Sequence, residues 1–101
     1  MIVYEVNLTI DSKIENECKS WLKKHVAEML KFDGFQSAEI FEDENREQSV
    51  CRLVVQYKVS SRDNLQNYLD NHSTRMREEG ARQLGNQFTA TRRILTVCGD
   101  S

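Results

Sequence analysis

The chain has 101 residues, of which 39% are hydrophobic and 30% charged, and its formal net charge is −2. These values are typical of one soluble globular domain over 1–101, and they offer no electrostatic attraction for nucleic acid or for an anionic membrane surface. No apolar run approaches the roughly 18 residues that span a bilayer, and the alternating N-terminal segment is typical of a strand rather than of a signal peptide. We therefore expect a cytoplasmic protein without nucleic-acid or membrane partners.

The first predicted element is a strand over 1–10, where apolar side chains alternate with a more polar set. Ser12 followed by Glu15 forms a capping-box pattern, which predicts a helix that begins there and runs to about Phe32. Gly34 then supplies the left-handed residue that ends this helical segment.

Three further elements are predicted in the second half of the chain. Strands are expected over 35–42 and 49–60, with a polar turn between them. One of the two serines that follow caps a second helix, which ends near Gly80, and a last strand covers 87–97. The order βαββαβ predicts a ferredoxin-like α+β fold, a four-stranded antiparallel sheet with two helices on one face.

The face of the sheet that the helices leave open is predicted to carry a mixture of apolar and polar side chains. Such a face suits contact with a partner, and the simplest partner is a second copy of the chain in an isologous homodimer. The residues expected at that interface are Val3, Glu5, Ile40, Val54 and Arg93. The alternative is an ordinary amphipathic face in contact with water.

Each predicted helix has a histidine in the middle of its apolar stripe, His25 on the first and His72 on the second. Because the two helices of this fold pack side by side, both imidazoles are expected to point at the sheet, where they could share one cavity. Either can instead be a core histidine with an internal hydrogen-bond partner. Two histidines without a placed cysteine or carboxylate fall short of the ligand set of zinc, so no metal is expected.

The last strand contains two adjacent arginines, Arg92 and Arg93, whose side chains must point to opposite faces of the sheet. Phe88 and Ala90 share the parity of Arg92, which predicts that Arg92 lies under the helices. A guanidinium there needs an anionic partner, either a carboxylate such as that of Glu79 or a bound anion. A β-bulge would exchange the positions of the two arginines.

Four segments, W..KHVAEML, GF.SAEIF, YL.NH..RMREEG and F.ATRRIL, together extend over most of the chain. They resemble an uncharacterised bacterial family of the dimeric α+β-barrel superfamily, which also holds antibiotic-biosynthesis-monooxygenase-like proteins. The resemblance implies a homodimer in which a small aromatic or anionic ligand would bind between helices and sheet.

Some members of that superfamily oxidise such a substrate without metal or flavin, whereas others bind haem, isomerise small rings or have no known reaction. Carried onto this sequence, the resemblance implies a pocket lined by Trp21, His25, Tyr68, His72 and Arg92. In a cofactor-free oxygenase, His25 or His72 would be the base and Arg92 would stabilise the substrate anion. Two hypotheses therefore stand, a homodimeric small-molecule-binding protein with or without such activity and without a cofactor, and a non-catalytic dimeric scaffold or interaction module.

Overall fold

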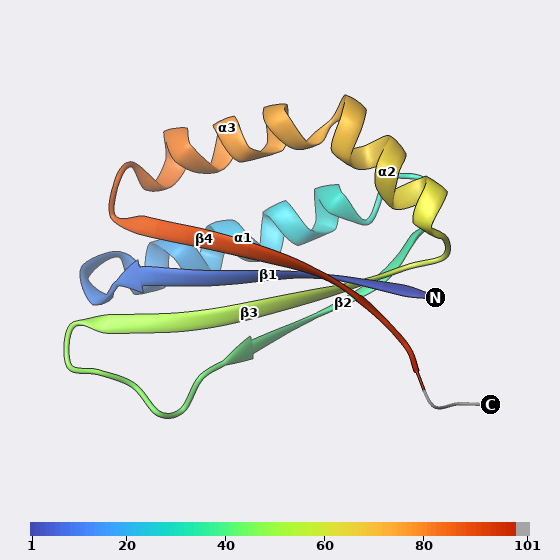
Figure 1. Cartoon of the computed structure of the whole chain (residues 1–101). Helices are drawn as coiled ribbons and strands as arrows, with labels where there is room; N and C mark the ends of the chain where they lie inside the picture. Colours follow the sequence, from blue (N-terminus) through green and yellow to red (C-terminus); the bar gives the residue numbers. More distant parts are fainter. Residues whose placement is uncertain (99–101) are drawn as a thin grey trace.

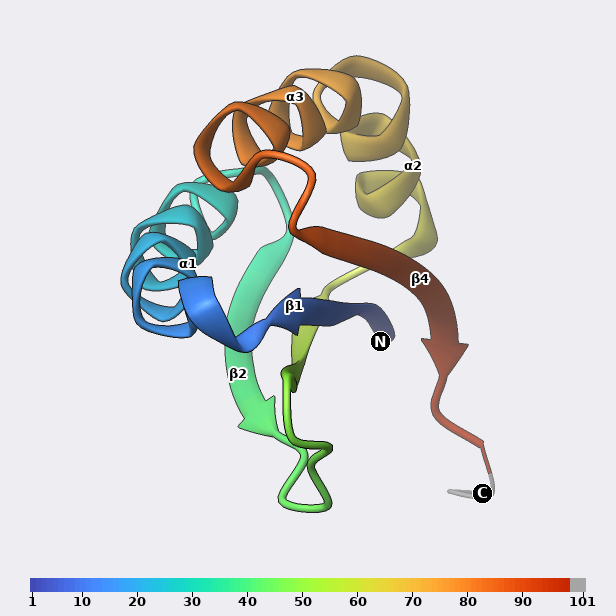
Figure 2. The same cartoon turned by 90° about the vertical axis from the view of Figure 1, so that its left-hand side faces the viewer.

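The computed structural model describes residues 1–98, so the last part of the predicted domain 1–101 lies outside the described residues. It contains one antiparallel sheet of order β2-β3-β1-β4, formed by β1 (Ile2–Asp11), β2 (Phe35–Glu42), β3 (Val50–Val59) and β4 (Phe88–Thr96). The helical elements are the 3₁₀ turn η1 (Ser12–Ile14), α1 (Glu15–Met29), α2 (Arg62–Asn71) and α3 (Ser73–Leu84). All three α-helices lie over one face of the sheet, which curves beneath them (Figures 1 and 2). The predicted ferredoxin-like fold is confirmed.

None of the helices in the described part of the chain is both long and apolar enough to cross a membrane. The hydrophobic core lies between these helices and the sheet, and the alternation of the two central strands builds it. The buried residues of β1 and β3 on that face are Ile2, Tyr4, Leu8, Ile10, Cys51, Leu53, Val55, Tyr57 and Val59. Val6 shares the face but is only partly buried, because the core is not filled above it.

The start of the first helix differs from the capping-box prediction. The carboxylate of Asp11, not the hydroxyl of Ser12, accepts the capping hydrogen bond, from the amide N–H of Lys13 at 2.9 Å. Glu15 does not close a box; it forms an ion pair with Arg46 at 2.6 Å. A tertiary partner for the carboxylate has therefore replaced the local one that the sequence pattern indicates.

The first helix also ends earlier than predicted, at Met29 rather than Phe32. Two turn hydrogen bonds follow, from the N–H of Phe32 to the Met29 carbonyl and from the N–H of Phe35 to the Phe32 carbonyl, both at 3.1 Å. Gly34 has a φ of 83°, as its predicted left-handed role requires.

The second predicted helix is two helices with a break at His72, whose φ is −130°. The hydroxyl of Ser73 donates to the carbonyl of Leu69 at 2.7 Å, and that carbonyl is the acceptor that the Ser73 amide would use in an unbroken helix. The predicted end near Gly80 is also wrong, because α3 passes through Gly80 and continues to Leu84.

The faces of β2 are reversed relative to the prediction. A bulge between Phe35 and Ser37 shifts the pairing of β2 with β3 by one residue. Ile40 consequently pairs with Val55 on the helix-facing side, while Phe41 occupies the open face. The prediction that Ile40 lies on the open face is therefore wrong, because one inserted residue turns every following side chain over.

The pairing of β4 with β1 determines which of the two arginines, Arg92 or Arg93, faces the helices. Val6 lies opposite Arg92 and Glu5 lies opposite Arg93, so Arg92 faces the helices and Arg93 the open face. Both placements agree with the parity of the last strand.

Glu5 is buried on the open face, with only 3% of its surface exposed. Its carboxylate accepts hydrogen bonds from Gln56 Nε2 at 3.0 Å, Asn7 Nδ2 at 3.0 Å and Arg93 Nε at 2.7 Å. These bonds, with the charge of Arg93, hold the pKa of Glu5 below its ordinary value. The network compensates a carboxylate that would otherwise be costly to bury.

Candidate functional site

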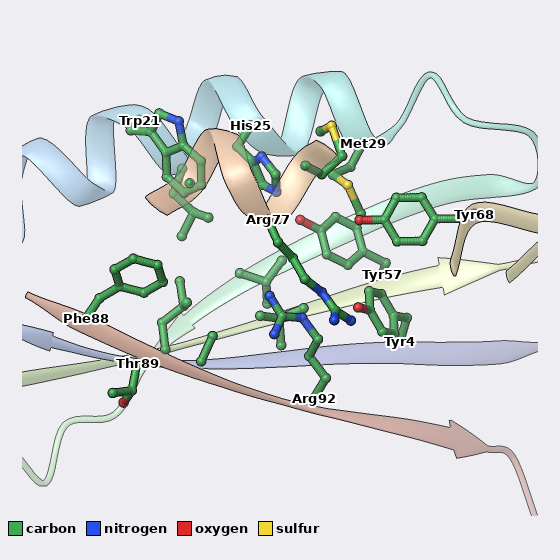
Figure 3. A pocket seen from close by; sticks show the side chains of 17 residues that line it. Tyr4, Trp21, His25, Met29, Tyr57, Tyr68, Arg77, Phe88, Thr89 and Arg92 are labelled. Atoms are coloured by element: carbon green, nitrogen blue, oxygen red, sulfur yellow. The ribbon is translucent and has the colours of Figure 1, made fainter. Parts of the chain in front are cut away.

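A cavity of about 450 Å³ lies between α1, α3 and the sheet, above the middle of β1 and β4. Figure 3 shows its side chains converging from all of these elements. Its walls are largely apolar and aromatic, and its lining residues are Tyr4, Val6, Leu8, Trp21, Leu22, His25, Met29, Val55, Tyr57, Tyr68, Met76, Arg77, Gly80, Phe88, Thr89, Ala90 and Arg92. The volume is within the range of small-molecule sites.

Trp21 and Phe88 lie toward one end of this cavity, away from the labelled tyrosines (Figure 3). The indole of Trp21 packs against α3 at Gly80, where a Cβ atom would come within 3.3 Å of the ring. Glycine is therefore tolerated in this helix despite its poor helix propensity, because it admits the tryptophan that forms the cavity wall.

His25 is half-buried, and its ring stacks on Trp21 with centroids 4.6 Å apart and an interplanar angle of 23°. Burial lowers its pKa, and the charge of Arg92 lowers it further against the opposing effect of Glu79. The imidazole is therefore neutral at pH 7, which is the form that can accept a proton.

Two cations reach the cavity, Arg77 from α3 and Arg92 from β4. Within residues 1–98, every ion pair closer than 4.0 Å that involves an arginine uses Arg46, Arg52 or Arg93. Glu79, the predicted partner of Arg92, is thus not paired with it. Arg92 is half-buried and Arg77 is exposed at the cavity rim, so both guanidinium groups are available to an anion.

Tyr4, Tyr57 and Tyr68 line the end of the cavity opposite Trp21 and Phe88, and their rings belong to an aromatic cluster. The ring centroid of Tyr68 lies 5.9 Å from that of Tyr4 and 5.2 Å from that of Phe35, which in turn contacts Tyr57 at 5.8 Å. Burial raises the pKa of Tyr57 and of Tyr68. Both phenols therefore stay protonated at neutral pH and can donate hydrogen bonds.

His72 does not reach this cavity, contrary to the prediction that the two imidazoles share one. Its ring stacks on Phe32 at 4.6 Å, and Phe32 in turn contacts Tyr68 at 5.1 Å. His72 is itself the break between α2 and α3 and has a non-helical φ of −130°, so the wheel of a continuous helix misplaces its side chain. It is part of the aromatic cluster.

The structure brings four of the five predicted pocket residues to the cavity wall: Trp21, His25, Tyr68 and Arg92. Sequence reasoning missed Arg77, Tyr4 and Tyr57. The two tyrosines could have been found, because each lies on the alternating apolar positions of β1 or β3 that face the helices. Arg77 follows the buried Met76 and carries no pattern that would distinguish it from a solvated arginine.

A second group of titratable residues, Glu15, Glu42 and Cys51, has ligand atoms within 4.8 Å of one another. Lys19 is within 2.8 Å of Glu42 and 2.7 Å of Glu15, and Arg46 also binds both carboxylates. Burial raises the pKa of the Cys51 thiol, which disfavours the thiolate that a metal would need. The cluster is an ion-pair network that ties α1 to the β2–β3 end of the sheet.

The profile of one protein family matches residues 1–98. The chain belongs to the family described as a domain of unknown function, DUF4286. No curated protein sequence matches this DUF4286 chain.

Solved structures share the fold of this DUF4286 chain at low identity. A candidate antibiotic biosynthesis monooxygenase from Deinococcus radiodurans has a TM-score of 0.76 at 11% identity, covering 100% of this chain and 95% of that chain. A variant of SnoaB, a cofactor-independent oxygenase from Streptomyces nogalater, has a TM-score of 0.73 at 15% identity and covers 97% of this chain and 94% of its own. The heme-degrader MhuD from Mycobacterium tuberculosis, with two hemes bound, has a TM-score of 0.73 at 13% identity. The match covers 100% of this chain and 99% of the MhuD chain. At these identities the likeness shows the fold alone.

Because Trp21 is the single tryptophan, the ionisation of His25 should be visible in its fluorescence. A protonated imidazole quenches a stacked indole, so the emission is expected to fall as the pH is lowered through the pKa of His25. That midpoint should lie below 6.5, the ordinary histidine value, because burial disfavours the cation. A fluorescence titration of the folded protein measures it.

His25→Gln should remove this transition, and His72→Gln, which changes the histidine outside the cavity, should leave it in place. A midpoint at or above 6.5 would show that the pKa of His25 is not lowered by its surroundings. A transition that survives His25→Gln would show that it does not arise from His25.

Proposed function

We propose that this DUF4286 protein binds a small aromatic anion in the cavity between α1, α3 and the sheet. The observation that carries the proposal is Arg92, a half-buried guanidinium on a largely aromatic wall that has no carboxylate partner among residues 1–98. An uncompensated charge in such a place is costly unless a ligand neutralises it. The aromatic surroundings favour a flat ring, and the proposed ligand therefore combines a ring with an acidic group.

We also propose that the protein is a homodimer joined through the open sheet face. All helices lie on the other face (Figure 1), so the described part of the chain leaves this face uncovered. It carries the partly buried Val3 and Val54 beside the Glu5–Arg93 pair, with Phe41 43% exposed near its edge. A face of mixed polarity that closes on a copy of itself satisfies both kinds of side chain.

We further propose a cytoplasmic location for the protein. A reducing compartment keeps its three free cysteines as thiols.

A second candidate function is cofactor-free oxygenation at the same cavity, and His25 favours it. SnoaB, which shares the fold, is a cofactor-independent oxygenase. In the proposed reaction, neutral His25 takes the proton of a phenol and Arg92 stabilises the anion that forms. Dioxygen then adds to the electron-rich ring, and the hydroperoxide loses water to leave a quinone. One oxygen atom enters the product, the other leaves as water, and the chain itself supplies the base and the cation.

The rival hypothesis, a non-catalytic dimeric scaffold, requires that the cavity residues serve structure alone. Under that hypothesis, replacing Arg92 would change stability without changing the affinity for any small molecule. The binding experiment below therefore separates the two hypotheses.

The binding proposal predicts unequal effects for two arginines. Arg92→Gln should weaken the binding of phthalate or phenyl phosphate by roughly tenfold or more, because a charge-assisted contact is lost. Arg82→Gln, which removes one charge from an exposed position of α3 outside the cavity, should alter the affinity by less than about twofold. Isothermal titration calorimetry gives both values, and circular dichroism confirms folding. Equal effects of the two substitutions would count against the cavity.

The dimer proposal predicts that light scattering will give twice the 11.8 kDa mass of the chain. Val54→Lys should return the protein to the monomer mass, because it places an unpaired charge in the centre of the interface. Ala27→Lys, the same gain of charge on an exposed position of α1, should leave the dimer intact. A wild-type protein that has the monomer mass at micromolar concentration would overturn the proposal.

The oxygenation proposal predicts oxygen uptake with an electron-rich phenol such as naphthoresorcinol, yielding its hydroxynaphthoquinone. His25→Gln should lower the rate by about a hundredfold or more, in line with the loss of a general base, while His72→Gln should retain it. An oxygen electrode and the quinone absorbance measure the reaction. Uptake that is insensitive to His25→Gln would reject catalysis and leave the binding proposal standing.

A further inference from the structure

Three buried tyrosines present polar atoms to the cavity that the protein itself does not use. Tyr4, Tyr57 and Tyr68 are 2%, 1% and 4% exposed. Within residues 1–98, the hydrogen bonds of side chains involve none of the three hydroxyls, yet no side-chain oxygen closed off from solvent lacks a partner. The hydroxyls are therefore open to the cavity, and Figure 3 shows them directed toward the region of Arg77.

The cavity offers many hydrogen-bond donors and few acceptors. None of its lining residues is an aspartate, a glutamate, an asparagine or a glutamine. The polar groups around the three hydroxyls are the guanidinium groups of Arg77 and Arg92, which can only donate. A ligand that satisfies this end of the cavity must therefore bring several acceptor oxygen atoms close together.

The two guanidinium groups also set the charge of that ligand. Arg77 comes from α3 and Arg92 from β4, and both side chains line the same cavity between the helix and the sheet (Figure 3). Neither has a carboxylate within ion-pair distance among the described residues. One negative charge would leave one of the two cations uncompensated, whereas two charges on one head group compensate both.

We propose that the cavity selects an aromatic ligand whose head group carries two negative charges close together, either on one group, as in an aryl phosphate, or on neighbouring groups, as in a vicinal aromatic dicarboxylate. This inference rests on the proposed binding function and names the ligand class of the same cavity. The head group lies among Arg77, Arg92 and the tyrosine hydroxyls, and the ring extends toward Trp21 and Phe88. The apolar end then contacts only the hydrocarbon part of the ligand.

Four benzene derivatives separate charge number from charge placement. Phenyl phosphate and phthalate carry two charges at one end of the ring, terephthalate carries two charges at opposite ends, and benzoate carries one. Titration calorimetry at about pH 8, where the phosphate ester is doubly ionised, should show phenyl phosphate and phthalate binding roughly tenfold or more tightly than benzoate. Terephthalate should bind no more tightly than benzoate, because its second carboxylate would enter the apolar end.

Variants assign the preference to the two arginines. Arg77→Gln and Arg92→Gln should each reduce the ratio of phthalate to benzoate affinity to within about threefold of one. Arg82→Gln is the matched control for Arg77→Gln, because it removes one charge from an exposed position of the same helix and should keep the full ratio.

The outcomes distinguish this inference from the function on which it rests. If benzoate binds as tightly as phthalate and phenyl phosphate, or terephthalate as tightly as phthalate, the inferred preference for a two-charge head group is wrong. The proposed binding function then still stands. If none of the four compounds binds, the proposed function fails and the inference fails with it.

Discussion

The ion pair between Glu5 and Arg93 fixes how the last strand lies on the sheet. Glu5 is buried, and a buried carboxylate that loses its cation is left with an uncompensated charge. A slip of one residue between β1 and β4 would turn Arg93 under the helices and place either Ile94, which cannot compensate the carboxylate, or Arg92 opposite Glu5. Either slip would also turn Phe88 and Ala90 away from the core. The same register directs Arg92 into the cavity. One interaction on the open face therefore positions the charged group of the candidate site on the other face.

The tyrosines connect the core to the site because each belongs to both. Their rings pack with one another and with Phe32 and Phe35 at centroid distances of 5.1–6.2 Å, which leaves the side chains little freedom. Their hydroxyls emerge where the core stops, at the cavity. A donor array held by rigid rings loses little entropy when it binds an anion, so the packing of the core supplies preorganisation to the site.

The cavity exists because the helices do not close over the middle of β1 and β4. Trp21 packs between α1 and α3 at Gly80, where an added Cβ atom would lie only 3.3 Å from the indole, and the half-buried Val6, Phe88 and Ala90 lie beneath the gap. An unfilled interior that holds a half-buried guanidinium, with no ion pair to it in the described part of the chain, is less stable than a packed one. Departures of this kind from good packing are characteristic of functional sites, which is why the cavity, rather than the ion-pair cluster around Glu15, is the candidate site.

The sequence by itself determined the order of the elements, the helix-facing stripes of β1 and β3, and the opposite directions of Arg92 and Arg93. Each follows from a period that the backbone geometry imposes on every residue of a strand or helix. It did not determine the faces of β2, the break at His72 or the passage of α3 through Gly80. These three features depend on single local events that follow no period in the sequence. The events are the bulge in β2, the hydrogen bond from the Ser73 hydroxyl to the Leu69 carbonyl, and the contact of Gly80 with Trp21.

The candidate site divides in the same way. His25, Trp21 and Arg92 could be placed from their stripes, because each lies on a regular element and points where its period directs it. His72 could not, because the helix that would have carried it to the cavity is broken at this residue. The convergence of Arg77 and the three tyrosines on one cavity was decided only by tertiary structure, since those residues come from four separate elements whose distances depend on how the helices pack on the sheet.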